Sequence, residues 1–126
     1  MTGEQILVVE DNEKNMKLFR DVLVATGFRT LEATTGGEAI DLASEHTPDL
    51  VLMDIQLPDL DGVEALHRLR ADERTATIPV LALTAQAMRG DRERFLAEGF
   101  DGYVSKPVNV REFVVIVQQH CEGRLG

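Results

Sequence analysis

The sequence lacks the features that mark secreted and membrane proteins. It has a single cysteine, Cys121, so an internal disulfide is excluded, which fits a reducing compartment. No apolar run approaches the length of a membrane span. Residues 1–5 contain no basic segment, and the apolar run at residues 6–9 is too short for a signal peptide. These absences predict a cytoplasmic protein.

Positive charge is also scarce. Lys and Arg number 13 against 22 Asp and Glu, and the formal net charge is −9 at pH 7. A chain this acidic lacks the excess of positive charge with which proteins bind nucleic acid, and an anionic membrane surface repels it. We therefore expect neither direct nucleic-acid binding nor membrane binding. The length of 126 residues and the 44% hydrophobic content predict one globular domain over residues 1–126.

Apolar runs alternate with amphipathic segments along the chain. Apolar and β-branched runs predict five strands, at residues 5–9, 29–33, 50–53, 80–83 and 103–105. Helical spacing of apolar residues predicts five helices, at residues 13–26, 37–45, 62–70, 91–98 and 110–121. Residues 122–126 read as a fraying tail, or as the start of a linker if the chain is cut from a longer protein.

This alternation of strands and helices, with short connections, is typical of an α/β protein. It predicts a parallel sheet with right-handed crossovers and helices on both faces. The strand at residues 29–33 carries alternating polar residues, so we expect it at an edge of the sheet.

Polar side chains follow four of the five predicted strands, at the point where each strand ends. Glu10 and Asp11 follow the first strand and Asp54 follows the third. Thr84 follows the fourth strand and Lys106 follows the fifth. Since the carboxyl ends of parallel strands share one edge of a sheet, where ligands bind, we expect these side chains to converge.

Each of these residues also has an ordinary structural explanation. Asp11 or Asn12 can cap the helix that follows, and Thr84 can cap another. Asp54 can be a turn residue, and Lys106 can be a solvated lysine. Any one of these explanations is as good as a functional one. All of them together, at four strand ends, are much less expected by chance, and we therefore predict one site.

The residue types at this edge predict phosphoryl transfer. Clustered carboxylates need a cation, and oxygen ligands favour Mg²⁺, which takes one or two carboxylates and keeps several waters. Glu10, Asp11 and Asp54 are such a set, and with Lys106 and one Mg²⁺ their formal charges balance. A carboxylate beside Mg²⁺ can attack phosphorus, while a lysine and a threonine such as Thr84 bind phosphoryl oxygens. We expect the phosphoryl group on Asp54.

Four short motifs surround these residues, in the order Val8-Val9-Glu10-Asp11-Asn12, Met53-Asp54-Ile55-Gln56-Leu57-Pro58, Leu83-Thr84-Ala85 and Tyr103-Val104-Ser105-Lys106-Pro107. With them the chain resembles the receiver domains of two-component response regulators, over essentially its whole length. One motif alone is weak evidence, but four at predicted strand ends are a strong signal. Residues 10–19 and 85–91 further resemble a single-domain cell-cycle regulator of that family, although residues 10–13 also occur in receiver domains fused to hybrid kinases.

The resemblance implies a flavodoxin-like (βα)5 three-layer sandwich with strand order 2-1-3-4-5. It makes Asp54 the phosphoacceptor, with a phosphohistidine on a sensor histidine kinase or a histidine phosphotransfer protein as the donor. Asp11, Asp54 and the backbone carbonyl of Gln56 would ligate Mg²⁺, and Glu10 would support the ion through water. The resemblance thus implies a signalling switch that catalyses only its own phosphorylation and dephosphorylation.

The resemblance also implies how phosphate changes the protein surface. Thr84 and Lys106 would bind the phosphoryl group, and Thr84 would leave room into which Tyr103 turns. This changes the face made by the fourth helix, fifth strand and fifth helix, where a downstream protein would bind. From the residues alone, Tyr103 is a half-buried ring on an edge strand. Met88 and Phe100 are either partner contacts on this face or core residues.

Other functions fit the residues less well. A pseudo-receiver that binds partners without phosphate does not need the complete set of acids, threonine and lysine. A haloacid-dehalogenase-like phosphatase needs an acid two residues after its nucleophile, where Gln56 stands. A flavodoxin-type cofactor binder needs a phosphate-cradling loop after the first strand, where Glu10 and Asp11 repel phosphate unless metal is present. The chain can also be a receiver fragment of a hybrid kinase or larger regulator.

Overall fold

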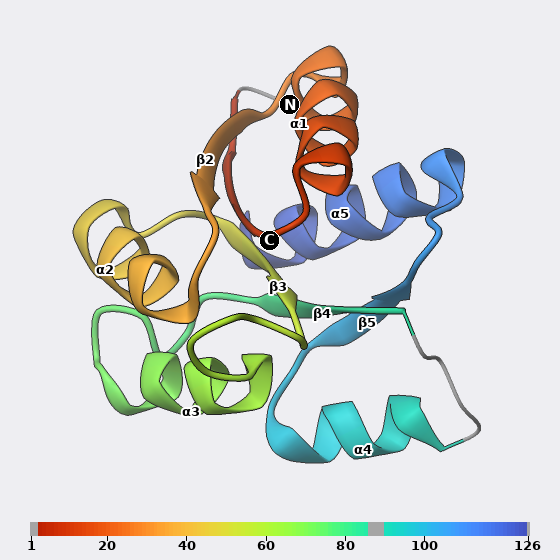
Figure 1. Ribbon diagram of the computed structural model, residues 1–126. Helices are drawn as coiled ribbons and strands as arrows, with labels where there is room; N and C mark the ends of the chain where they lie inside the picture. Colours follow the sequence, from red (N-terminus) through yellow and green to blue (C-terminus); the bar gives the residue numbers. More distant parts are fainter. Residues whose placement is uncertain (1–2, 86–89, 126) are drawn as a thin grey trace.

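Five strands alternate with five helices in the computed structural model, which describes residues 3–85 and 90–125 (Figure 1). The strands are β1 (Gln5–Val9), β2 (Arg29–Ala33), β3 (Leu50–Asp54), β4 (Val80–Thr84) and β5 (Gly102–Ser105). The helices are α1 (Glu13–Thr26), α2 (Gly36–His46), α3 (Gly62–Ala71), α4 (Asp91–Glu98) and α5 (Val110–Leu125). All strand pairs are parallel, in the order β2-β1-β3-β4-β5. The predicted architecture and the edge position of β2 are confirmed.

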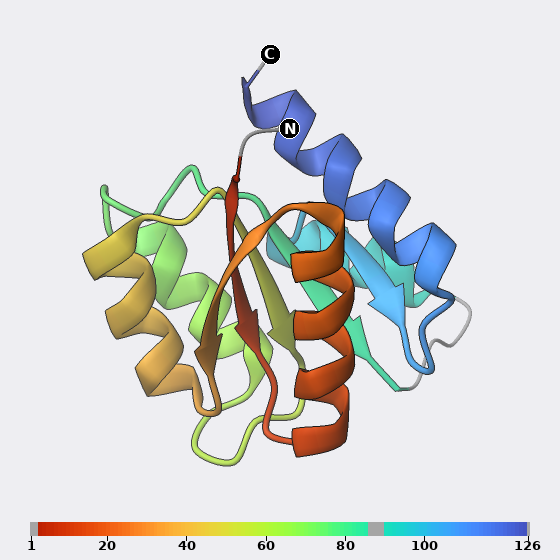
Figure 2. The ribbon, with the colours of Figure 1, turned by 90° about the horizontal axis from the view of Figure 1, so that it is seen from above.

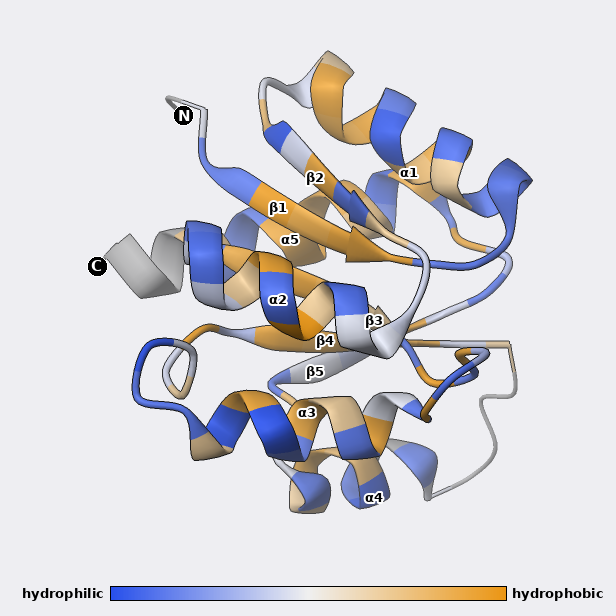
Figure 3. Ribbon diagram, turned by 60° about the vertical axis from the view of Figure 1, so that its left-hand side comes forward, coloured by the Kyte–Doolittle hydropathy of each residue, from blue (hydrophilic) through white to orange (hydrophobic). Residues whose placement is uncertain are grey.

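Helices cover both faces of the sheet, and each face has its own apolar core (Figure 2). Alternate strand residues point to opposite faces. Leu7 and Val9 of β1 belong to the core under α2, α3 and α4, while Ile6 and Val8 belong to the core under α1 and α5. The central strands β1, β3 and β4 are mostly apolar, and the helices carry many polar residues (Figure 3). Within the described ranges, none of the helices combines the length and apolar content that a bilayer span requires.

Short polar residues at the start of helices explain why the elements begin where they do. The side chain of Asn12 accepts a hydrogen bond from the backbone N–H of Asn15 at 3.0 Å and caps α1. The capping explanation therefore holds for Asn12 and not for its neighbour Asp11. In the same way Asp61 accepts from the N–H of Glu64 at 2.8 Å and caps α3.

The C-terminal helix is longer than the sequence predicted. We expected it to end at Cys121 and the following residues to fray, but α5 continues to Leu125. Gly123 costs a helix about 1 kcal/mol relative to alanine, yet it does not remove a backbone hydrogen bond as proline does. Val117 and Cys121 are buried against the sheet and anchor the preceding turns. A single glycine therefore does not end this helix.

The guanidinium group of Arg70 joins three parts of the fold at the edge of the sheet where the strands begin. Nη1 donates to the backbone oxygens of Ala76 and Ile78, at 3.1 and 2.6 Å. Nη2 donates to the backbone oxygen of Gly99 and to Oδ2 of Asp101, at 3.1 and 3.0 Å. One side chain thus ties the end of α3 to the segment before β4 and to the α4–β5 connection.

Replacing Arg70 by alanine is expected to lower the free energy of unfolding by about 2–4 kcal/mol, because several acceptors lose a charged donor. Lysine should recover only part of this loss, since an ammonium group lacks the planar fork that reaches two pairs of acceptors. Chemical denaturation of both variants measures the effect. Arg68→Ala is the control, because Arg68 is exposed and pairs only with Glu64 of its own helix in the contacts described. Equal stability of Arg70→Ala and Arg68→Ala would contradict the stabilising role of the Arg70 hydrogen bonds.

Candidate functional site

The polar side chains predicted to converge do lie together at one edge of the sheet. Asp54 and Thr84 are the last residues of β3 and β4, one position beyond the predicted strand ends. Glu10 and Asp11 directly follow β1, and Lys106 directly follows β5. One carboxylate oxygen each of Glu10, Asp11 and Asp54 lies within 4.8 Å of the other two. The acids that follow β1 and end β3 thus form one acidic cluster.

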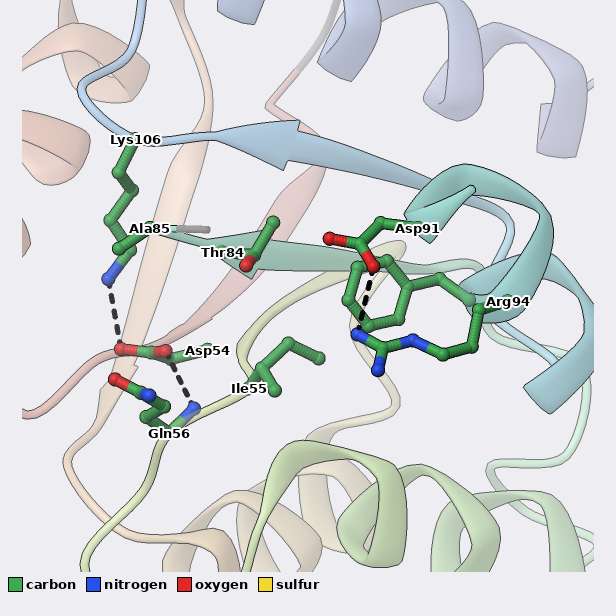
Figure 4. A pocket seen from close by; sticks show the side chains of 9 residues that line it. Asp54, Ile55, Gln56, Thr84, Ala85, Asp91, Arg94 and Lys106 are labelled. Atoms are coloured by element: carbon green, nitrogen blue, oxygen red, sulfur yellow. Dashed lines mark hydrogen bonds and ion pairs between the residues drawn. The ribbon is translucent and has the colours of Figure 1, made fainter. Parts of the chain in front are cut away.

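Lys106 is the counterion of two buried acids. Its Nζ donates to Oε1 of Glu10 at 2.7 Å. The same Nζ donates to Oδ2 of Asp54 at 3.0 Å (Figure 4). The side chains of Glu10 and Asp54 are only 1% and 6% exposed, so water and salt screen these ion pairs weakly. The N–H groups of Asn12 and Gln56 donate to the remaining oxygens, at 3.2 Å for Glu10 and 2.9 Å for Asp54.

The pKa values of Glu10 and Lys106 are both raised, but for different reasons. Burial raises the pKa of Glu10, and the nearby carboxyl of Asp54 raises it further, against the hydrogen bond from Lys106. Burial lowers the pKa of Lys106, but the hydrogen bonds and charges of Glu10 and Asp54 outweigh it, and the pKa of Lys106 is raised. Lys106 therefore remains a cation. The ionised form of Glu10 is disfavoured by its burial and by the nearby Asp54.

The donor set fits a magnesium ion. Three carboxylates against one ammonium group leave two formal negative charges, which a divalent cation balances. Asp11 is exposed, so an ion at this cluster can keep part of its water shell, as Mg²⁺ does in proteins. Glu10, Asp11 and Asp54 are the residues that would hold the ion. The backbone carbonyl of Gln56, two residues after Asp54, stays a predicted ligand.

A cavity of about 160 Å³ opens beside Asp54 (Figure 4). Thr84 and Lys106 line it together with Asp54, as their predicted role in binding a phosphoryl group requires. Asp91 and Arg94 of α4 also line it and form an ion pair, with Nη2 and Oδ1 3.2 Å apart. The sequence analysis missed these two residues. Their opposite charges, three positions apart on a predicted helix, were the only available signal.

Tyr103 lies partly buried on the edge strand β5. Its ring centroid is 6.1 Å from that of Phe95, and it packs against the core under α2, α3 and α4. This agrees with the ordinary explanation of a half-buried ring, and an inward turn on phosphorylation stays a prediction. Phe100 is 3% exposed and is a core residue. Met88 lies outside the described residues.

Comparison with known sequences identifies the class to which this site belongs. The sequence pattern of the response regulator receiver domain matches residues 6–118. The chain therefore belongs to the family of response regulator receiver domains. Within that family it is 49% identical over 117 residues to the polar-differentiation response regulator DivK of Brucella ovis, covering 93% of this chain and 95% of the relative. The DivK of Brucella anthropi is 48% identical over the same length. The predicted resemblance to single-domain DivK-like regulators is confirmed.

Solved structures agree with this assignment. The receiver domain of the sensor histidine kinase PA1611 from Pseudomonas aeruginosa PAO1 has a TM-score of 0.88 and 37% identity, over 96% of this chain and 99% of that one. That crystal structure has a magnesium ion coordinated in its active site cleft. A CheY-like receiver domain protein from Methanospirillum hungatei has a TM-score of 0.86 and 26% identity, over 98% and 97% of the two chains. The flavodoxin-like receiver fold is confirmed.

Proposed function

We propose that Asp54 is the phosphoacceptor of a two-component or phosphorelay system. The observation that carries this proposal is the bridge that Lys106 makes between Glu10 and Asp54, next to the exposed Asp11. An oxygen of Asp54 attacks the phosphorus of a phosphohistidine. The phosphorus–nitrogen bond breaks, its electron pair goes to the imidazole, and an aspartyl phosphate forms.

Each residue of the site has a role in this transfer. Asp11, Asp54 and the backbone carbonyl of Gln56 hold Mg²⁺, and Glu10 supports it through water. When bound, the ion neutralises charge on the phosphoryl oxygens. The ammonium group of Lys106, already within hydrogen-bond distance of Asp54, donates to a phosphoryl oxygen. The Thr84 hydroxyl, in the same cavity, donates to another.

Thr84 and Tyr103 are the proposed switch residues, and the strand register supports their coupling. Tyr103 pairs with Ala82 of β4, and both belong to the core under α2, α3 and α4. Thr84 lies two residues after Ala82 and therefore points to the same face. Movement of Thr84 toward the phosphoryl group vacates space on the face where Tyr103 packs. Hydrogen bonds to charged groups are worth about 1.5–3 kcal/mol each, enough to shift such an equilibrium many-fold.

The proposed partners are proteins on both sides of the transfer. A sensor histidine kinase or a histidine phosphotransfer protein donates the phosphoryl group, and a downstream protein binds the face made by α4, β5 and α5. The 126 residues act as one receiver domain in the cytoplasm, without direct contact to nucleic acid or membrane. The protein is a switch that catalyses only its own phosphorylation and dephosphorylation.

Metal removal tests this function directly. Incubation with acetyl phosphate and Mg²⁺ is expected to add one phosphoryl group, about 80 Da in the intact mass. The added mass should be labile to base, as an acyl phosphate is, and a chelator should prevent its formation. Circular dichroism of the same samples shows whether the protein stays folded. No gain in mass for folded protein with Mg²⁺ would instead favour a phosphate-independent binding module.

A further inference from the structure

The loop at residues 55–61, between β3 and α3, is fastened to a distant helix by one side chain. Oδ1 of Asp59 accepts the backbone N–H of Gly36 at 2.8 Å, and Oδ2 accepts that of Gly37 at 2.9 Å. Both amides belong to the first turn of α2. The same loop contains Gln56, whose backbone carbonyl is the proposed magnesium ligand outside the carboxylates.

Asp59 completes the N-terminal cap of α2 from another part of the chain. The first N–H groups of a helix have no partner within the helix. The local cap, Thr35, accepts the N–H of Glu38 at 3.1 Å, so it leaves Gly36 and Gly37 to Asp59. Hydrogen bonds from these two N–H groups hold the pKa of Asp59 below its usual value. The contact between loop and helix is thus made by an ionised carboxylate.

Close packing holds the loop at both ends as well. A Cβ atom at Gly36 would lie 2.7 Å from Cδ1 of Leu60, so the loop lies directly on the helix terminus. A Cβ atom at Gly62 would lie 2.5 Å from the backbone oxygen of Asp54. The Gly62 N–H also donates to the oxygen of Ile55 at 2.9 Å. The loop is therefore fixed between α2 and the end of β3, and Asp59 makes the polar part of that attachment.

We propose that Asp59 is a positioning residue for magnesium, which keeps the backbone of Gln56 in the place from which its carbonyl ligates the ion. This inference rests on the proposed function, in which Gln56 is a ligand. Two residues separate Gln56 from Asp59, and one of them, Pro58, has a fixed φ angle, so the link between them is short and stiff. Mg²⁺ requires near-octahedral ligands at about 2.0–2.1 Å and tolerates displaced ligands poorly.

Loss of the Asp59 contacts is expected to weaken magnesium binding while leaving the chemistry of Asp54 intact. Without Asp59, the loop must be ordered when the ion binds, and this ordering costs conformational entropy. Mutation of a residue that hydrogen-bonds directly to a metal ligand changes metal affinity by about 10- to 100-fold. Asp59 acts on the ligand Gln56 only through the intervening backbone. We therefore expect a smaller change, about 3- to 10-fold in the dissociation constant.

Isothermal titration of the whole 126-residue chain with MgCl₂ measures this affinity for wild type, Asp59→Ala, Asp59→Asn and Thr35→Ala. Asp59→Ala should weaken binding, and Asp59→Asn should lie between it and wild type because the amide keeps one acceptor oxygen. Thr35→Ala is the matched control, since it removes a cap from the same helix end without releasing the loop. The magnesium dependence of phosphorylation by acetyl phosphate, followed by mass, should show a raised half-saturation with a nearly unchanged maximal rate.

Three results separate this inference from the proposed function. Asp59→Ala with wild-type magnesium affinity overturns the inference alone. Equal weakening by Thr35→Ala and Asp59→Ala also overturns it, because the effect then comes from the stability of α2. Wild type that binds no magnesium overturns the proposed metal site, and the inference with it. If Asp59→Ala does not fold, Asp59→Asn decides by the same measurements, since asparagine has almost the same shape as aspartate.

Discussion

Asp54→Asn is expected to abolish phosphorylation while the protein remains folded. The amide oxygen of asparagine is a much weaker nucleophile than a carboxylate, so no acyl phosphate forms. The amide has the same shape and still accepts the hydrogen bond that Lys106 now donates at 3.0 Å. It also removes one charge from a cluster in which Glu10, Asp11 and Asp54 repel one another. The metal-free stability of the variant should therefore equal or exceed that of wild type.

Intact mass after incubation with acetyl phosphate and Mg²⁺, together with thermal melting in chelator, measures both parts of this expectation. Asp61→Asn is the control, because it makes the same change of charge in the loop after β3, and asparagine also caps a helix well. It should gain the phosphoryl group as wild type does. A base-labile phosphoryl group on Asp54→Asn would mean that another acid is the phosphoacceptor. Strong destabilisation of Asp54→Asn in chelator would refute the repulsion among the three acids.

Most of the fold could be predicted because each element is specified locally. Buried strands are continuous apolar runs, and the surrounding helices show apolar residues at helical spacing, so their number and order follow from the chain. The convergence of Glu10, Asp54 and Lys106 could be predicted for the same reason. The carboxyl ends of parallel strands share an edge whichever strands are neighbours. The roles of these residues stay proposals that depend on the family.

Individual side-chain contacts that depend on how helices and loops pack could not be predicted. Nothing in the residues around Asp59 indicates that its carboxylate binds the N-terminus of α2, and the sequence around Arg70 does not point to Gly99 or Asp101. Such contacts depend on how the helices pack across the sheet, which hydrophobic periodicity does not specify. That Lys106 bridges two acids, rather than one, likewise depends on side-chain geometry.

Lys106→Ala is expected to separate phosphorylation from its structural consequence. Removing the ammonium group leaves Glu10 and Asp54 buried without their shared counterion, which should lower the metal-free stability by about 2–4 kcal/mol. Mg²⁺ should restore much of this loss, because the ion replaces the missing positive charge. At saturating Mg²⁺, Asp54 should still accept a phosphoryl group, since its own carboxylate is unchanged.

The response of Tyr103 to that phosphoryl group is the part expected to fail in Lys106→Ala. Lys106 directly follows β5, the strand that contains Tyr103, so its proposed bond to a phosphoryl oxygen would couple the end of this strand to the phosphoryl group. The chain has one tyrosine and no tryptophan, so intrinsic fluorescence reports on Tyr103 alone. Phosphorylation should change this fluorescence in wild type and in the control Lys14→Ala, which alters an exposed lysine on α1. An undiminished change in phosphorylated Lys106→Ala would mean that Thr84 alone couples the phosphoryl group to Tyr103.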